Sequence, residues 1–107
     1  LKAELTAINQ YFLHAEMQAN WGYMRMAGIT RKESIEEMQH AEELIERILY
    51  LEGTPNLSEL FMLRIGQNVK EQLQNDLQLE YEAVPRLNRA INAAVAAADN
   101  GSRDLFE

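Results

Sequence analysis

Apolar residues recur along this chain at steps of three and four, which is the spacing of one face of an α-helix. Three separate stretches show this pattern. The first stripe consists of Leu1, Glu4, Ile8, Tyr11 and Ala15, the second of Glu37, His40, Leu44, Ile48 and Leu51, and the third of Leu73, Leu77, Glu80, Val84, Leu87 and Ile91. The pattern predicts an all-α protein in which three long helices each turn one face toward a shared core.

Turn-forming residues set the expected ends of the first two helices. We expect helices over residues 1–19 and 21–52, with Asn20 as the N-cap of the second and Gly53 as the left-handed residue after its end. The alternative for the second helix is a break near Gly28 with a restart at Thr30.

A long connection separates the second helix from the third. It runs from the turn at Gly53 to about Gln67, which is too long to join adjacent antiparallel helices, so we expect it to cross the bundle from end to end. The third helix should cover residues 68–98 and be kinked at Pro85. After a turn, a fourth helix should begin at about Asn100.

Ionisable side chains occupy places that the periodicity assigns to the core: Glu4, Glu37, His40 and Glu80. A buried charge is costly unless it is paired or binds a metal. Glu37 and His40 are three residues apart, so they leave the same face of a helix one turn from each other. Carboxylate and imidazole are the ligand types that a redox-active iron site takes from a helix bundle.

The predicted helix lengths bring these groups to one level of the bundle. Glu4 lies about as far before the turn at Asn20 as Glu37 lies after it, so an antiparallel hairpin places them side by side. Glu80 lies near the middle of the third helix. Any one of these residues taken alone is ordinarily a surface or salt-bridged side chain. Their common height favours a metal site.

Three further side chains have competing interpretations. Met38 shares a face with Ile35 and Ile45, turned away from Glu37, and as such is an ordinary packed methionine. Tyr11 is either a hydrogen-bonding or redox partner of the metal site or a plain core tyrosine. We expect His14 to lie at the surface.

The composition is that of one small domain over residues 1–107, and the net charge limits the classes of partner that it could bind. The chain is 47% hydrophobic, and its formal charge of −7 argues against nucleic acid and anionic membranes as partners. It has no cysteine and no apolar run long enough to cross a bilayer, and we expect no signal peptide. The chain starts and ends within helical patterns, so we expect that the start of the first helix and most of the fourth are missing.

Several segments resemble the bacterioferritins, the haem-containing bacterial ferritins, along the whole chain without a shift in register. The segment from Glu33 to Ala41, which contains Glu37-Met38-Gln39-His40, is the most specific. The other matching segments are ELTAINQYFLH from Glu4, Asn20-Trp21-Gly22, IERIL from Ile45, LEGTPNL from Leu51 and Ser102-Arg103-Asp104-Leu105.

The resemblance implies a ferritin-like up-down-down-up four-helix bundle and assigns roles to its residues. Glu4 and His40 would be terminal ligands of one iron, Glu37 would bridge two irons and Glu80 would be a terminal ligand of the second. Tyr11 would stand beside this di-iron centre. The haem-binding set would be Met38, which shares haem b with its copy in a second subunit across a two-fold axis, and the pocket residues Leu5, Ile8 and Asn9.

Two departures from the family pattern affect the site. The family has a second Glu-x-x-His on its fourth helix, which this sequence does not reach, so only part of the ligand set is present. Lys32 replaces a histidine that binds iron on the inner surface of some relatives, and protonated lysine is a poor ligand.

The resemblance implies an iron-storing ferroxidase that oxidises Fe(II) with O2 or peroxide. It implies a bacterial cytoplasmic homo-oligomer of twenty-four subunits, built from haem-bridged dimers, with haem aiding iron release and a ferredoxin-type reductant as a partner. The alternatives are a haem-free ferritin or another di-iron carboxylate oxidase, and a helical interaction module whose glutamates and histidine form buried ion pairs.

Overall fold

The computed structural model describes the backbone of residues 1–96 and the side chains of residues 1–83. Three helices, α1 (Lys2–Asn20), α2 (Met24–Tyr50) and α3 (Val69–Ala96), form the structure, and residues 1–96 contain no strand. The all-α prediction is therefore confirmed. The expected fourth helix at Asn100 lies outside the described residues. No helix in the described part is both long and apolar enough to cross a membrane.

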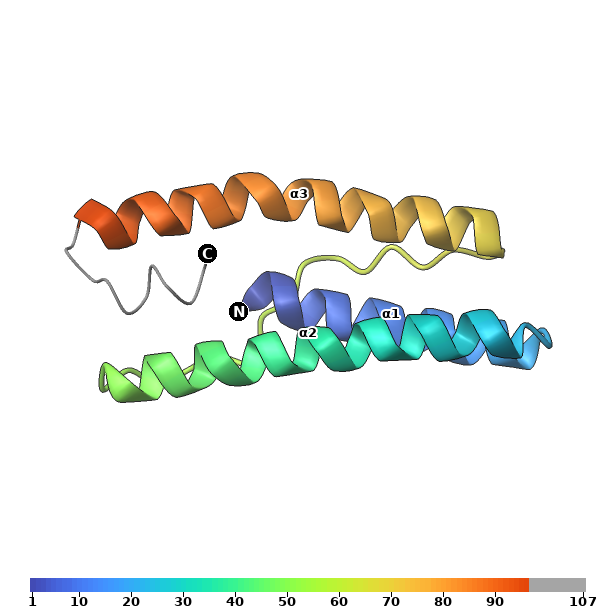
Figure 1. Ribbon diagram of the computed structural model, residues 1–107, viewed down its shortest axis with the longest axis horizontal. Helices are drawn as coiled ribbons and strands as arrows, with labels where there is room; N and C mark the ends of the chain where they lie inside the picture. The colour runs from blue at the N-terminus through green and yellow to red at the C-terminus, as the bar shows by residue number, and fades with distance from the viewer. Residues whose placement is uncertain (97–107) are drawn as a thin grey trace.

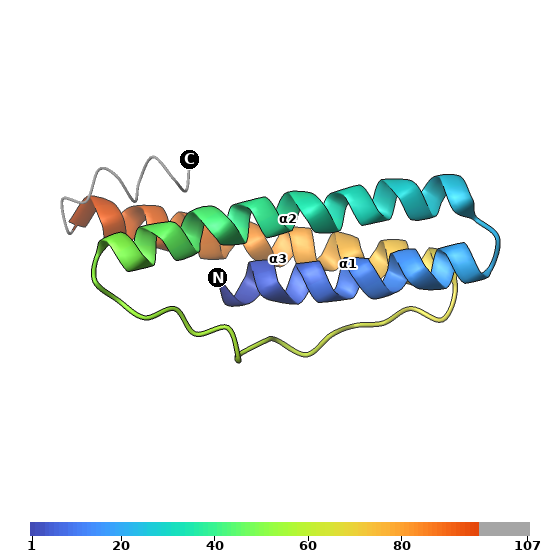
Figure 2. The same ribbon diagram turned by 90° about the horizontal axis from the view of Figure 1, so that it is seen from below.

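The helices follow an up-down-down course (Figure 1). α1 and α2 form an antiparallel hairpin, and α3 runs in the same direction as α2 along another side of α1. The connection from α2 to α3 travels the length of the bundle, as its length predicted (Figure 2). Within the described residues, the backbones of α2 and α3 each approach α1 closely but not each other.

The turn between α1 and α2 differs from the expected one. Asn20 is the last residue of α1, not the N-cap of α2, which begins after Tyr23. The left-handed residue is Gly22, with φ +92°, and the N–H of Tyr23 reaches back to the carbonyl of Gln18 at 2.9 Å. This pair of features is a Schellman ending of α1. The helix therefore uses residues that the sequence assigned to the next one.

The end of α2 corrects a second boundary. The left-handed residue is Glu52, with φ +62°, not Gly53. The N–H of Gly53 instead donates to the carbonyl of Ile48 at 2.9 Å, and a Cβ added at Gly53 would lie 3.1 Å from the side chain of Ile48. Close approach, rather than a positive φ, explains the glycine. The helix also passes through Gly28 without the break considered for it.

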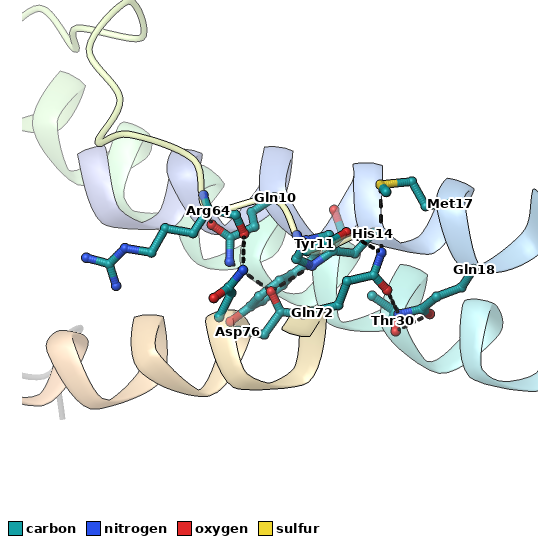
Figure 3. Close-up of polar contacts among 12 residues, drawn as sticks. Gln10, Tyr11, His14, Met17, Gln18, Thr30, Arg64, Gln72 and Asp76 are labelled. Atoms are coloured by element: carbon teal, nitrogen blue, oxygen red, sulfur yellow. Dashed lines mark hydrogen bonds and ion pairs between the residues drawn. The ribbon is translucent and has the colours of Figure 1, made fainter. Parts of the chain in front are cut away.

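Helix α1 turns a mostly polar face into the bundle. Its buried residues are Thr6, Ala7, Gln10, Tyr11, His14, Ala15 and Gln18. The expectation that His14 lies at the surface is wrong, because its exposed fraction is 0% and both ring nitrogens have partners. Among the side chains of residues 1–83, the apolar cluster consists of Ala7, Tyr11 and Leu79. Polar side chains that are hydrogen-bonded to one another therefore occupy much of the space between the helices (Figure 3).

Two of the predicted core stripes are out of phase with the observed packing. Helix α2 buries small residues, Ala27, Thr30, Ser34 and Ala41, while His40 and Leu51 are exposed. On α3, Leu73 and Leu77 are 50% and 55% exposed. The reason is that α3 packs against α1 and the connection that precedes it, so the covered line is Gln72, Asp76 and Leu79. The side chains of Val84, Leu87 and Ile91 lie outside the described residues.

Candidate metal site

Three carboxylates from three helices line one small cavity. Glu4 of α1, Glu37 of α2 and Glu80 of α3 surround a space of about 30 Å³ together with Tyr11. The helix lengths predicted this common level. The other residues that line the cavity are three alanines and one leucine, namely Ala3, Ala7, Ala83 and Leu79. Small neighbours leave room for the carboxylates to approach one another.

Two of the carboxylates have side-chain partners. The hydroxyl of Tyr11 donates to Oε1 of Glu80 at 2.5 Å. Oε2 of Glu37 lies 3.5 Å from Nδ1 of His40, at the limit of a hydrogen bond. Tyr11 thus orients one of the three acidic groups.

Of the four predicted iron ligands, His40 is the one that does not line the cavity. Its side chain is 60% exposed and reaches the site only through Glu37. Among the described side chains, no group of three or more histidines, aspartates and glutamates stands at metal-binding spacing. The structure brings the three carboxylates together, with the imidazole one helical turn away. Whether these groups bind metal remains a prediction.

The surroundings favour protonation in the site. Burial raises the pKa of Glu37, the nearby carboxylates of Glu80 and Glu4 raise it further, and His40 opposes them. Burial raises the pKa of Tyr11 well above its usual range, and its hydrogen bond to Glu80 adds to that shift. The phenol therefore stays a neutral donor across the physiological range. A bound cation would relieve the crowding of negative charge.

A larger acidic groove adjoins the cavity between α2 and α3. It measures about 390 Å³, and its lining residues are Tyr11, Glu33, Glu36, Glu37, Leu73, Asp76, Leu77 and Glu80. Glu37, Glu80 and Tyr11 belong to both spaces. Burial, then Asp76 and Glu80, raise the pKa of Glu33. The groove gives the cavity an approach through negatively charged walls.

Sequence reasoning missed Glu33, Glu36 and Asp76 as members of this groove. A signal was present, because Asp76 and Glu80 are four residues apart, as are Glu33 and Glu37, and such pairs share a helix face. The burial of Asp76 could not be predicted, because it is not flanked by a stripe of apolar residues on its helix face. Its neighbours on the buried line of α3 are Gln72 and Leu79.

The opposite face of α2 is apolar and open. Met38 is 54% exposed and lines neither acidic space, in agreement with the face on which helical periodicity puts it. Leu5 and Ile8 are half-buried, and Asn9 is exposed with its side-chain amide donating to the carbonyl of Leu5 at 2.8 Å. The thioether is therefore accessible from outside the hairpin.

Comparison with known proteins extends over the whole chain. The family described as Ferritin-like domain matches residues 1–107. The bacterioferritin of Mycolicibacterium paratuberculosis is 52% identical over 107 residues, which is 100% of this chain and 67% of the relative. For that of Streptomyces coelicolor the identity is 51% over 107 residues, 100% of this chain and 64% of the relative. The chain thus spans about two thirds of these relatives.

Solved structures give the same picture. A bacterioferritin of Rhodobacter capsulatus, described with a metal-free dinuclear site and its haem iron in a crystallographic special position, aligns with a TM-score of 0.95 and 45% identity over 98% of this chain and 66% of that one. The Mycobacterium tuberculosis bacterioferritin BfrA aligns with a TM-score of 0.95 and 48% identity, over 98% and 66% of the two chains. The relatives share the arrangement of α1, α2 and α3.

Proposed function

Because this chain belongs to the bacterioferritins, within the ferritin-like family, we propose that the full-length protein stores iron and oxidises Fe(II) at a site that includes Glu4, Glu37, His40 and Glu80. The observation that carries the proposal is the cavity that the three carboxylates share. Carboxylate oxygen and imidazole nitrogen suit Fe(II), and gathered negative charge favours Fe(III) as the metal loses an electron.

The position of each residue supports a distinct role. Glu37 lies in both acidic spaces, between the groups of α1 and α3, which suits a carboxylate shared by two metal positions. Glu4 serves one position and Glu80 the other. His40 contacts Glu37 and supplies its nitrogen to the position that Glu4 serves. The iron ions, when bound, supply the electrons that reduce O2 or peroxide.

Tyr11 acts through its hydroxyl. It donates to Glu80 at 2.5 Å, and its raised pKa keeps the proton on the phenol. The hydrogen bond fixes the orientation of the Glu80 carboxylate and occupies one lone pair of Oε1. Tyr11 is therefore a positioning residue of this site.

A fourth helix of a ferritin-like bundle would complete the site. The family resemblance implies a second Glu-x-x-His on a fourth helix, which would face the groove between α2 and α3. Among the described side chains, Leu73 and Leu77 remain half exposed on the walls of that groove. A helix placed there would cover both leucines and bring its ligands to Glu37 and Glu80.

The other face of α2 supports haem binding. Two copies of Met38, one from each of two subunits, would bind the haem iron, with Leu5, Ile8 and Asn9 around the ring. Support comes from the exposed thioether and from the special position of the haem iron in the Rhodobacter capsulatus relative, since a special position is a symmetry axis. Haem bound there would supply electrons for iron release, received from a ferredoxin-type donor.

Assembly follows the family. We propose a cytoplasmic homo-oligomeric shell of twenty-four subunits that holds Fe(III) mineral, with the haem-bridged pair as its repeating unit. Lys32 lies exposed on α2, and its ammonium group offers no lone pair to iron. An inner-surface iron site that depends on this position is therefore not expected.

Stopped-flow oxidation of Fe(II) tests the proposed activity. In the full-length protein, Glu37→Ala should abolish the fast initial phase, because the variant removes the carboxylate that both positions share. Glu46→Ala is the matched control, since Glu46 is an exposed glutamate of the same helix. A fast phase that survives at stoichiometric iron in the Glu37 variant would refute the assignment.

A further inference from the structure

The long connection between α2 and α3 is bound to α1 by three side chains at regular spacing. The backbone N–H of Phe61 donates to Oγ1 of Thr6 at 2.8 Å, and that of Arg64 donates to Oε1 of Gln10 at 2.9 Å. Thr6 and Gln10 are four residues apart on one helix face. Helix α1 thus offers side-chain acceptors to the part-buried amide groups of an extended segment that belongs to no sheet.

The last member of this row is His14. Its Nε2 accepts the N–H of Gly66 at 3.0 Å, and its Nδ1 lies 2.9 Å from Oδ1 of Asp76 on α3. A nitrogen that accepts a hydrogen bond carries a lone pair, so the ring is neutral and its proton is on Nδ1, where it is donated to Asp76. The imidazole therefore joins three elements, α1, the connection and α3.

Gly66 contacts both His14 of α1 and Gln72 of α3. A Cβ added to it would lie 2.4 Å from the backbone nitrogen of Gln72, so its backbone packs directly on the start of α3. Its carbonyl accepts Nε2 of Gln72 at 3.2 Å. The same Gln72 accepts from Gln18, which in turn accepts from Thr30 of α2. Figure 3 shows this network running from α1 to α3.

We propose that His14 is a pH-sensitive clasp that fastens the connection to the start of α3 and opens when its ring is protonated. Protonation at Nε2 removes the lone pair that accepts the Gly66 amide and sets one N–H against another. The bond from Nδ1 to Asp76 persists and gains charge assistance. Acid therefore releases the connection while it leaves α1 and α3 joined. Imidazole is the side chain whose ordinary titration falls between about pH 5 and pH 8.

The titratable groups around His14 do not themselves bind the amides that α1 holds in the connection. Asp76 of α3 contacts the ring directly, and Tyr11 of α1 and Glu33 of α2 line the same groove as Asp76. From the connection, the guanidinium of Arg64 pairs with Glu82 at 2.8 Å. Thr6 and Gln10, which hold the neighbouring amides, do not titrate. Only the third fastening can change with pH.

Gln10 supplies the design of a matched variant. Its Oε1 accepts a backbone N–H of the connection and its Nε2 donates to Asp76, which is the pair of bonds that His14 makes one turn later. His14→Gln therefore keeps an acceptor for Gly66 and a donor for Asp76 but removes the titration. The other control is Thr6→Val, which removes a non-titrating acceptor.

Hydrogen–deuterium exchange of the assembled full-length protein, resolved by mass spectrometry over residues 58–67, tests the clasp. After correction for intrinsic exchange, protection of this segment should fall several-fold between about pH 7.5 and about pH 5.5. It should stay constant in His14→Gln. Thr6→Val should lower protection equally at both values. An equal acid-induced loss in His14→Gln, or no loss in the unsubstituted protein, would overturn the proposal.

A second measurement removes any dependence on the folding of the variants. Exchange of the imidazole C2 hydrogen reports the protonation of His14 in the unsubstituted protein. The midpoint of that titration should coincide with the loss of protection over residues 58–67. A loss of protection at a pH where His14 does not change its protonation would refute the clasp.

Discussion

The glutamates of α2 are chemically alike but lie in different surroundings. Glu37 reaches both the small cavity and the larger groove, Glu33 reaches the groove alone, and Glu46 is exposed on another part of the helix. Position on the helix circumference, rather than residue type, decides which carboxylate can serve a metal.

Glu4 and Glu37 should differ in how many metal positions they support. Binding of Co²⁺, a redox-stable substitute for Fe(II), can be counted by titration calorimetry of the full-length protein. Glu4→Ala should lose one of the two positions, because that carboxylate serves only the position shared with His40. Glu37→Ala should lose both. Equal losses in the two variants would show that neither carboxylate bridges.

Glu33 should make the metal-free protein less stable at neutral pH. Its pKa is raised in the folded state, by burial first and by Asp76 and Glu80 next. The folded state therefore holds a proton that the unfolded chain releases earlier, and stability falls as pH rises from the ordinary carboxyl value through the raised one. Glu33→Gln should raise the free energy of unfolding at about pH 7, by less than about 1 kcal/mol because solvent screens an exposed side chain.

The sign of that effect depends on pH. Below the ordinary carboxyl range, at about pH 4 or lower, both states are largely protonated and the advantage of glutamine should disappear. Urea unfolding at the two pH values checks the difference. A stabilisation that is the same at both would trace the effect to packing instead of charge.

Met38 should affect haem without affecting iron oxidation. A thioether is a soft ligand that suits low-spin haem iron and does not compete with carboxylates for Fe(II). Met38→Leu conserves volume and apolarity, so shell assembly should be retained. The Soret band of haem should be lost, the Fe(II) oxidation rate should stay close to normal and release of stored iron should slow. Full haem content in the variant would mean that another residue holds the haem.

At the scale of the helices, periodicity predicted the number of long elements, their order and the length-spanning connection, because these follow from chain length between turn signals. Which face of each helix is buried was predicted less well. Helix α2 packs through alanine, serine and threonine, which a search for large apolar residues does not weigh. His14 was misplaced because its burial depends on Asp76 and Gly66, which are distant in sequence. Long-range partners of polar groups cannot be found from local pattern.

Two glycines of the hairpin should respond oppositely to alanine. Gly22 has φ +92°, a conformation that costs an L-residue about 1–2 kcal/mol, so Gly22→Ala should lower the free energy of unfolding by about that amount. Gly28 lies inside α2 with nothing within 4 Å of an added Cβ, so Gly28→Ala should raise it by about 0.5–1 kcal/mol. Chemical unfolding of the metal-free protein compares them. Destabilisation by both would mean that α2 is not a continuous helix.

At the scale of the whole molecule, α2 separates two chemistries. One side carries the carboxylates that face α1 and α3, and the other carries Met38 on an open apolar surface. The common level of Glu4, Glu37 and Glu80 was predictable from sequence because all three lie on long, regular helices. The exposure of the His40 imidazole was not, since a side-chain rotamer does not follow from helical periodicity. Metal binding by these residues stays a prediction.

Anomalous diffraction at the iron edge, from crystals of the full-length protein exposed to Fe(II), would locate the iron that is oxidised. We expect iron peaks within coordination distance of the carboxylates of Glu4, Glu37 and Glu80 and the imidazole of His40, with Glu37 in contact with more than one. Iron bound only elsewhere, in a protein that still oxidises Fe(II) rapidly, would refute the proposed site.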